Sequence, residues 1–217
     1  MDLTPARVSM VKSQIRPNQV DDEVVLEAML ATPREAFLPK ALHGIAYVDE
    51  DLPLGNGRFM MEPLVLARLL QAAVAKPDDI GLVIGCATGY TPAVLSRMVS
   101  AVVAVESEPG LVQKSSTDLT DQGIDTVAVI EGSLSAGYAK QAPFDVILFD
   151  GAVDEVPEEI AAQLAEGGRL LAVVRKGPRS GQGVIIARNK GILSRRELFD
   201  ANIPYLPGFE PKKEFEF

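Results

Sequence analysis

The residues best suited to chemistry in this 217-residue chain stand at the ends of two apolar runs. The first run, 80–84, leads into the small-residue turn Gly85–Tyr90, and the second, 102–105, ends in Glu106. A turn of small residues lets a ligand approach the backbone closely. A carboxylate about 20 residues further on can accept hydrogen bonds from two ribose hydroxyls. The spacing therefore predicts a nucleotide-type binding site.

The composition of the turn distinguishes between such ligands. It reads Gly-Cys-Ala-Thr-Gly and lacks the G-x-G-x-x-G spacing that accommodates the pyrophosphate of a dinucleotide. A nicotinamide-dependent dehydrogenase is therefore a distant alternative. The pattern better suits S-adenosylmethionine, which has no phosphate. The cofactor contacts predicted here are Gly85, Cys86, Ala87, Thr88, Gly89, Tyr90 and Glu106.

An alternation of strands and helices must position these residues. We expect strands at 80–84, 101–105, 126–130, 144–149 and 169–174, and helices at 89–99, 108–122 and 156–165. The strands are almost continuously apolar, which is typical of a parallel sheet with helices on both faces. Residues 183–188 and 194–199 predict a terminal antiparallel hairpin around Asn189–Gly191. The last segment, 205–217, is expected to be a surface strand or a dimer contact.

The first 61 residues are organised differently. Thr4 and Pro5 predict the start of one helix, and Asp21 is expected to cap a second that ends before Pro33. Residues 38–61 are irregular, and a loop of that length is usually functional. We therefore divide the chain into N-terminal helices with a substrate loop, 1–61, and a cofactor-binding domain, 62–217, within one compact unit.

Ligands of open parallel sheets bind outside the carboxyl ends of the strands. Two further predicted strand ends carry polar or small residues. Ser133 and Leu134 follow the third strand, and Asp150 follows the fourth. We add these three residues to the predicted cofactor site.

Composition excludes several other kinds of protein. The net charge is -9 and no basic stripe is visible, so we expect no nucleic-acid partner. One cysteine and one histidine rule out an internal disulfide and a Cys- or His-rich metal site, and we predict no metal. No apolar run approaches the length of a membrane span, and the N-terminus does not read as a signal peptide. We expect a cytoplasmic monomer or homodimer that does not contact membranes.

Several short segments carry a family resemblance. They are Pro33–Pro39 (P-R-E-A-F-L-P), Ala46–Asp49 (A-Y-V-D), Pro53–Gly57 (P-L-G-N-G) and the more widespread Gly167–Leu170 (G-G-R-L). On these segments, collinear from about residue 11 to 175, the chain resembles the protein-L-isoaspartate (D-aspartate) O-methyltransferase family. The resemblance implies an α/β, Rossmann-like, S-adenosylmethionine-dependent methyltransferase fold. That fold has a mostly parallel sheet with a C-terminal antiparallel hairpin, helices on both faces and an N-terminal helical extension.

The resemblance also implies a reaction. The family transfers a methyl group from S-adenosylmethionine to the α-carboxylate of an isoaspartyl residue in a peptide or protein, and the ester collapses to a succinimide as a step of protein repair. A carboxylate is already a nucleophile, so the enzyme mainly aligns it with the methyl group in a water-poor site. The position of Asp49 in the A-Y-x-D segment implies an active-site role for that residue.

The substrate loop departs from the family pattern. The family reads Gly-Gln-Thr-Ile-Ser-x-Pro where this chain has Gly57–Pro63, G-R-F-M-M-E-P. Met61 therefore stands at the position of the active-site serine and Arg58 at that of the glutamine. Arg58 is either a solvated charge or a bidentate partner for a carboxylate. We expect the loop 47–61 to cover the strand ends and close the methyl-transfer cavity.

Other departures lie in the cofactor motifs. Val83 replaces an acid, Ala87 replaces a glycine of the turn, and Ser133 replaces the aspartate that holds the adenine amine in the family. An alternative hypothesis therefore stays open: a degenerate family member that keeps the fold as a binding or regulatory module.

Overall fold

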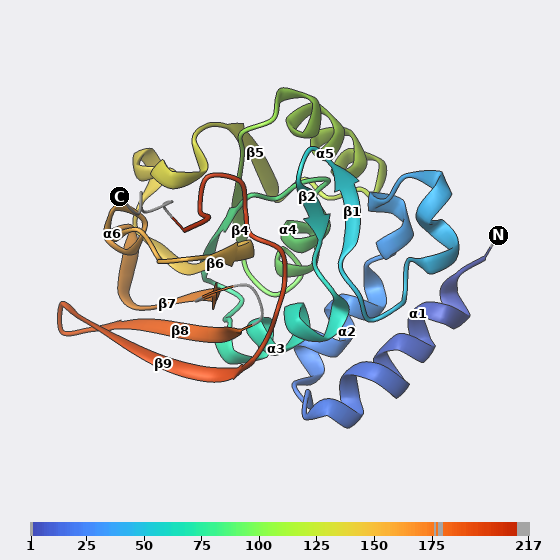
Figure 1. The fold of residues 1–217 in the computed structure, drawn as a ribbon, viewed down its shortest axis with the longest axis horizontal. Helices are drawn as coiled ribbons and strands as arrows, with labels where there is room; N and C mark the ends of the chain where they lie inside the picture. Colours follow the sequence, from blue (N-terminus) through green and yellow to red (C-terminus); the bar gives the residue numbers. More distant parts are fainter. Residues whose placement is uncertain (1, 176, 178–179, 212–217) are drawn as a thin grey trace, which may run out of the picture.

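A computed structural model describes residues 2–175, 177 and 180–211 of the chain. Its centre is a seven-stranded sheet of order β5-β4-β3-β6-β7-β8-β9 (Figure 1). The neighbours from β5 to β7 pair in parallel, and β8 and β9 add antiparallel partners at one edge. The strands are β3 Ile80–Ile84, β4 Ala101–Glu106, β5 Val127–Glu131, β6 Phe144–Val153, β7 Leu164–Arg175, β8 Gly181–Asn189 and β9 Ile192–Asp200.

Helices and short turns cover both faces of the sheet. Alternate residues of each strand enter two separate hydrophobic clusters, with Val83 in one and Leu82 and Ile84 in the other. The first cluster includes buried residues of the helices from α1 to α5. The second lies under α6 and residues 201–211, which we name the C-terminal strap. The helices are α1 Thr4–Met10, α2 Glu23–Ala31, α3 Pro63–Ala73, α4 Tyr90–Leu95, α5 Pro109–Asp121 and α6 Glu158–Ala161.

Shorter helical turns complete the chain. The π-helical turn η1 and the 3-10 turn η2 extend α1, while η3 and η4 lie in the segment before the first strands and η5 and η6 precede β6. They are η1 Val11–Ile15, η2 Arg16–Asn18, η3 Arg34–Phe37, η4 Lys40–Ile45, η5 Leu134–Ala136 and η6 Ala139–Gln141.

The fold class predicted from the sequence is confirmed, and several boundaries are wrong. The helix expected at 156–165 is the single turn α6, because β7 already begins at Leu164. The helix expected at 89–99 ends at Leu95. The side chain that caps α2 belongs to Asp22, not Asp21, and accepts a hydrogen bond from the Val24 amide at 2.9 Å.

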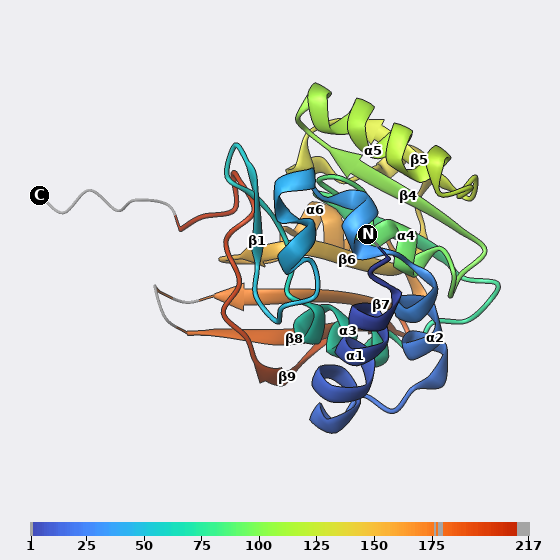
Figure 2. The ribbon, with the colours of Figure 1, turned by 90° about the vertical axis from the view of Figure 1, so that its right-hand side faces the viewer.

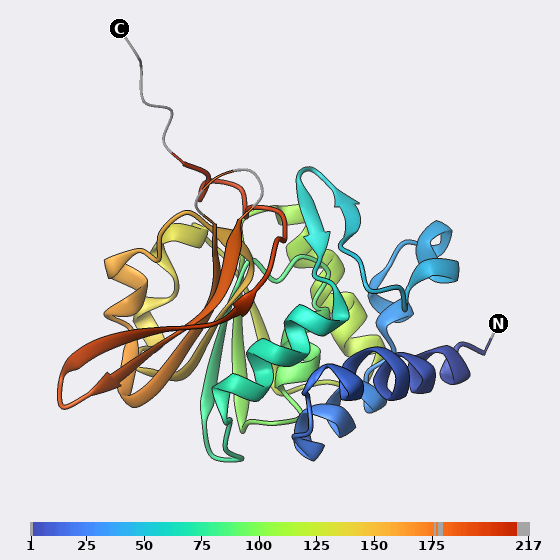
Figure 3. The ribbon, with the colours of Figure 1, turned by 60° about the horizontal axis from the view of Figure 1, so that its bottom comes forward.

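The irregular segment 38–61 contains a hairpin that the sequence analysis missed. Strands β1 (Leu52–Gly55) and β2 (Arg58–Met60) form a separate antiparallel pair. Their connection has positive φ angles at Gly55, Asn56 and Gly57, which glycine adopts without strain. Figure 3 shows this hairpin standing above the sheet on the side where the strap also lies.

The C-terminal strap returns from β9 to the carboxyl end of β6. The Ala152 amide donates to the Pro204 carbonyl and the Leu206 amide to the Ala152 carbonyl, both at 2.8 Å. Leu206 and Phe209 are buried within the chain, so the expectation of a surface strand is wrong for this part, and the alternative of a dimer contact stays a prediction. The same expectation for 212–217 lies outside the described residues. Figure 2 shows the strap crossing the sheet beside the β1–β2 hairpin.

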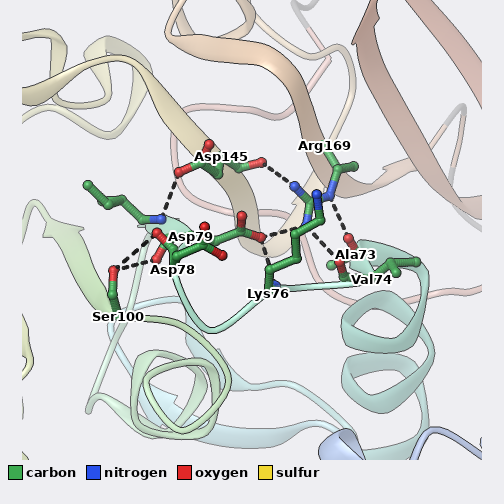
Figure 4. A network of polar contacts seen from close by, with 9 residues as sticks. Ala73, Val74, Lys76, Asp78, Asp79, Ser100, Asp145 and Arg169 are labelled. Carbon is green, nitrogen blue, oxygen red and sulfur yellow. Dashed lines mark hydrogen bonds and ion pairs between the residues drawn. The ribbon is translucent and has the colours of Figure 1, made fainter.

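A polar network ties the opposite end of the sheet together (Figure 4). Arg169, from the G-G-R-L segment, donates through Nε to the Ala73 carbonyl at 2.6 Å and through Nη2 to the Val74 carbonyl at 2.8 Å. The same Nη2 pairs with Asp79 Oδ2 at 2.6 Å. Arg169 of β7 therefore joins the end of α3 to the residue before β3 and, through the Asp145 carbonyl, to the start of β6.

Within the described part of the chain, no helix is both long and apolar enough to cross a bilayer.

Candidate active site

The glycine turn after β3 bends back over the end of β4. The Gly85 amide donates to the Val105 carbonyl at 2.8 Å, and φ is positive at Gly85, Ala87 and Gly89. An L-residue seldom adopts this conformation, so Ala87 keeps the backbone shape of the glycine that it replaces at some cost in strain. The turn stands where the chain order of the sheet reverses, the usual ligand-binding position in such folds.

Glu106 ends β4 as a fully buried carboxylate directed at this turn. Oε2 accepts from the Ala87 amide at 2.8 Å, and Oε1 accepts from the amides of Ser107 at 2.8 Å and Glu108 at 3.2 Å. Backbone N–H donors of the turn and of the residues after β4 therefore fix the position of both carboxylate oxygens. The acid and the turn that the sequence spacing linked are therefore in direct contact.

Arg58 of β2 lies in the same place. Its Nη2 donates to Glu106 Oε2 at 2.8 Å and to the Gly85 carbonyl at 2.6 Å, and its side chain is only 2% exposed. The possibility of a solvated charge is therefore wrong. Arg58 does pair with a carboxylate, but the partner in this structure is Glu106 of the chain itself.

Leu206 of the strap fills the space next to Arg58. A Cβ atom on Gly85 would lie 2.7 Å from Leu206 Cδ2 and 2.9 Å from Arg58 Nη2, and one on Gly151 would lie 2.7 Å from Leu206 Cγ. The remaining cavity measures about 10 Å³, which is about the volume that one water molecule needs. Its lining includes Asp51, Gly57, Arg58, Phe59, Met61, Asp150, Gly151 and Ile203–Leu206.

Asp150 is a buried acid in this lining. Burial raises the pKa of its carboxyl to about 7, while the Thr91 hydroxyl and the charges of Arg58 and Arg34 act in the opposite direction. Asp150 Oδ1 and Arg58 Nη1 are both buried without a hydrogen-bond partner. The closed cavity is therefore lined by polar groups that are not satisfied, which is costly for a folded protein.

The sequence analysis predicted Asp49 as the acid that contacts the methyl acceptor, but the acid that lines the cavity is Asp51. Asp49 is exposed and accepts from the Leu64 amide at 3.0 Å, at the start of α3. Asp51 lies in the lining and accepts from the Glu62 amide at 3.0 Å. Burial raises the pKa of Asp51 to about 6, and burial with nearby acids raises that of Glu62 to about 7.

Met61 is buried in the cavity lining, as the position of the serine in the family pattern implies. Its carbonyl accepts a hydrogen bond from Arg34 Nη2 at 2.5 Å. Arg34, Asp51 and Leu206 are the residues that sequence reasoning missed. Arg34 belongs to the P-R-E-A-F-L-P segment of the family resemblance, which could have marked it as a site residue. No sequence pattern marked Leu206, because its place in the site depends on the path of the strap.

The remaining predicted cofactor residues surround the turn. Cys86 and Thr88 are buried, and burial raises the pKa of the Cys86 thiol. Tyr90 is buried with its ring under the Arg34 guanidinium, 4.9 Å from the centroid. Leu134 is buried, whereas Ser133 is exposed and bonds Ser135 at 3.0 Å. Across the described residues, no group of three or more His, Cys, Asp or Glu side chains is arranged to hold a metal ion.

The parallel sheet with its terminal hairpin, the glycine turn at the switch point and the buried acid define the class of Rossmann-like S-adenosylmethionine-dependent methyltransferases. Residues 6–206 match the family model described as Protein-L-isoaspartate(D-aspartate) O-methyltransferase (PCMT). The chain therefore belongs to this methyltransferase family.

Relatives of this family resemble the chain over most of its length. It is 37% identical to the protein-L-isoaspartate O-methyltransferase of Koribacter versatilis, covering 93% of this chain and 90% of the relative. It is 39% identical to that of Methylorubrum extorquens, covering 88% and 82%. Among solved structures, a protein-L-isoaspartate O-methyltransferase aligns with a TM-score of 0.81 at 26% identity, covering 93% of this chain and 66% of that one.

A second solved structure supports the fold alone. It is a putative protein-L-isoaspartate O-methyltransferase from Plasmodium falciparum in complex with S-adenosyl-L-homocysteine. It aligns with a TM-score of 0.80 at 22% identity and covers 92% of this chain and 97% of that one.

Proposed function

We propose that this protein transfers a methyl group from S-adenosylmethionine to a carboxylate of a peptide or protein, with the isoaspartyl residue as acceptor. The proposal rests on membership of the family and on one observation in particular: the buried carboxylate of Glu106 contacts the glycine turn through the Ala87 amide at 2.8 Å. We expect the protein to act on its substrates in the cytoplasm, as a monomer or homodimer.

The chemical groups around the turn match those that S-adenosylmethionine needs for binding. Glu106 is oriented by backbone amides and is a suitable acceptor for vicinal hydroxyls, and Gly85 beside it has no side chain to obstruct a ligand. In this conformation Arg58 and Leu206 take the adjoining space. When bound, S-adenosylmethionine supplies an electrophilic methyl group. Gly85–Tyr90 and Glu106 would hold it, with Ser133, Leu134 and Asp150 at the neighbouring strand ends.

Methylation of the acceptor carboxylate requires little acid–base catalysis from the protein. An acceptor carboxylate is nucleophilic at neutral pH, so the site must orient it and exclude water. Phe59, Met61 and Leu206 are apolar and suited to excluding water from the cavity. The raised pKa keeps the Cys86 thiol protonated, so it is not a competing nucleophile. Asp49 and Arg58 remain candidates for contact with the acceptor once the cavity is open.

The test is a radiolabelled methyl-transfer assay on an isoaspartyl peptide and on the matching aspartyl peptide. The proposal predicts a base-labile methyl ester on the isoaspartyl peptide alone. A Glu106→Gln variant should lose most of the activity through a weaker affinity for the cofactor. The exposed neighbour Glu108 provides the control variant, Glu108→Gln, which should retain it. Folded wild-type protein that labels neither the isoaspartyl peptide nor any protein of a cell lysate would contradict the proposal.

A further inference from the structure

Two side chains from distant segments fill the space beside Glu106. Arg58 comes from the β1–β2 hairpin and Leu206 from the C-terminal strap, and both lie against Gly85. We propose that Arg58 is a latch: it competes with the ribose of the cofactor for Glu106 and thereby sets the affinity of the site. The inference rests on the proposed function, because that function assigns Glu106 to the ribose.

The hydrogen bonds of Glu106 account for the competition. A carboxylate offers about four acceptor positions. Glu106 uses them for the amides of Ala87, Ser107 and Glu108 and for Arg58, and the Ser107 hydroxyl donates a longer bond to Oε1 at 3.5 Å. The three amides belong to the backbone of the turn and of the end of β4, so they stay where they are. Arg58 is the side-chain partner that must leave before a ribose hydroxyl can reach Oε2.

Arg58 lies next to the turn of a hairpin that no other strand holds. Among the described strands β1 and β2 pair only with each other, and Leu52 and Met60 anchor them in the first hydrophobic cluster. The side chain of Arg58 gains little from its second nitrogen, because Nη1 is buried without a hydrogen-bond partner. Movement toward solvent would hydrate the whole guanidinium group and offset part of the lost ion pair.

Leu206 is the second side chain that occupies the space beside Glu106, and we call the filling of this space by Arg58 and Leu206 the closure. The strap backbone is held to Ala152 by two hydrogen bonds of 2.8 Å, and the Leu206 side chain lies over both Gly85 and Gly151. A cavity of about 10 Å³ is far smaller than the several hundred Å³ of a cofactor pocket. Both side chains must therefore withdraw, and only Arg58 carries a specific bond to the acid.

A latch of this kind lowers the apparent affinity by the fraction of molecules that are open. Replacing Arg58 removes the competitor while leaving the amide bonds of Glu106 in place. Glutamine is a suitable replacement because it is uncharged and polar, and it is the residue found at this position in the family's loop pattern. The affinity for the cofactor should therefore rise when Arg58 becomes Gln.

The experiment is calorimetric titration with S-adenosylhomocysteine of the wild-type protein, Arg58→Gln and Leu206→Ala. The matched control is Arg16→Gln, because Arg16 is an exposed arginine in an ion pair with Glu23. Thermal unfolding of each sample verifies that it is folded. We expect Arg58→Gln to bind at least tenfold more tightly than wild type, Leu206→Ala about threefold more tightly, and Arg16→Gln with unchanged affinity.

The outcomes separate this inference from the proposed function. Binding by wild type with equal or weaker binding by folded Arg58→Gln would overturn the latch and leave the proposed function standing. Absence of binding by wild type and both site variants at millimolar ligand would contradict the proposed function as well. If Arg58→Gln fails to fold, Leu206→Ala decides: an affinity equal to or below that of wild type would overturn the closure.

Discussion

Arg58 and Glu106 form a buried ion pair between the hairpin and the end of β4, with Nη2 2.8 Å from Oε2 and side chains 2% and 0% exposed. The pair joins the segment expected to receive the acceptor to the acid expected to hold the cofactor. The two halves of the candidate site are therefore not independent. A ligand that takes the Oε2 position of Glu106 must displace the Arg58 side chain of the β1–β2 hairpin.

The two partners should contribute unequally to stability. After Glu106→Gln, Arg58 keeps its buried charge with the Gly85 carbonyl as its remaining acceptor, and the loss should be about 3–5 kcal/mol. After Arg58→Met, Glu106 still accepts from the amides of Ala87, Ser107 and Glu108, so we expect a loss of about 1 kcal/mol. Urea unfolding of both variants measures this difference. A larger loss for Arg58→Met than for Glu106→Gln would be inconsistent with the bonding described.

Substitutions of Phe59 and Met61 in the substrate loop should change acceptor use more than cofactor affinity. Met61→Ser, alone or with Phe59→Thr, widens the cavity and restores hydroxyl groups that can bond an acceptor. We expect higher isoaspartyl methylation, nearly unchanged affinity for S-adenosylhomocysteine and a stability loss of about 2 kcal/mol from the buried methionine.

Met60 is a matched control for this prediction, because it is buried immediately before Met61, as the last residue of β2, but is not part of the cavity lining. Met60→Ser should cost similar stability and leave methylation no higher than in wild type. A double variant whose cofactor affinity falls as much as its activity would remove the assignment of Met61 to the acceptor side.

Asp150 should make the protein less stable as the pH rises. The folded-state pKa of about 7 lies above that of an unfolded aspartate, so both states are protonated well below pH 4 and the group then costs nothing. Between about pH 4 and 7 the unfolded state loses its proton first, and the free energy of unfolding falls by at most about 4 kcal/mol. Arg58, Arg34 and Glu106 are the charged groups that act on Asp150.

Asp150→Asn should remove this part of the pH dependence, as measured by urea unfolding at pH 5 and pH 8. The control is Asp121→Asn, which makes the same change at an exposed position. If both variants lose stability between these pH values to the same extent, Asp150 is not the buried acid that the geometry indicates.

The clamp at the other end of the sheet should serve stability alone. Arg169→Lys removes the guanidinium group that donates to the Ala73 and Val74 carbonyls together. We expect the free energy of unfolding to fall by about 2–3 kcal/mol. Cofactor affinity should stay within twofold of wild type, since the clamp lies at the starts of the strands. The exposed Arg196 provides the control, Arg196→Lys, with no loss of stability. A large loss of affinity in Arg169→Lys would place this residue in the binding site instead.

Local pattern predicted much of the molecule. The apolar runs identified the parallel strands in order, because a strand buried on both faces must be apolar throughout. The spacing from Gly85 to Glu106 brought the turn and the acid together, since neighbouring parallel strands end at the same edge. The Asn56–Gly57 pair was a hairpin signal within the loop. Pro53 and the shortness of both strands concealed it.

The parts that the sequence did not reveal depend on tertiary placement. Nothing local to Arg58 indicates that its partner is Glu106, because the contact arises from how the hairpin folds over the sheet. Leu206 is likewise positioned by bonds between the strap and Ala152. The acid run 49–51 gave no local reason to prefer Asp51 over Asp49; the difference is that Asp51 is partly buried next to the start of α3, whereas Asp49 is exposed.

A crystal structure with S-adenosylhomocysteine bound tests the central claim most directly, through the distance between Arg58 Nη2 and Glu106 Oε2. We predict that the ribose hydroxyls of the ligand lie on Glu106 and that Arg58 has moved beyond hydrogen-bonding distance, from the 2.8 Å of the closed form. A bound ligand whose ribose contacts other residues, with the Arg58–Glu106 pair intact, would contradict the account.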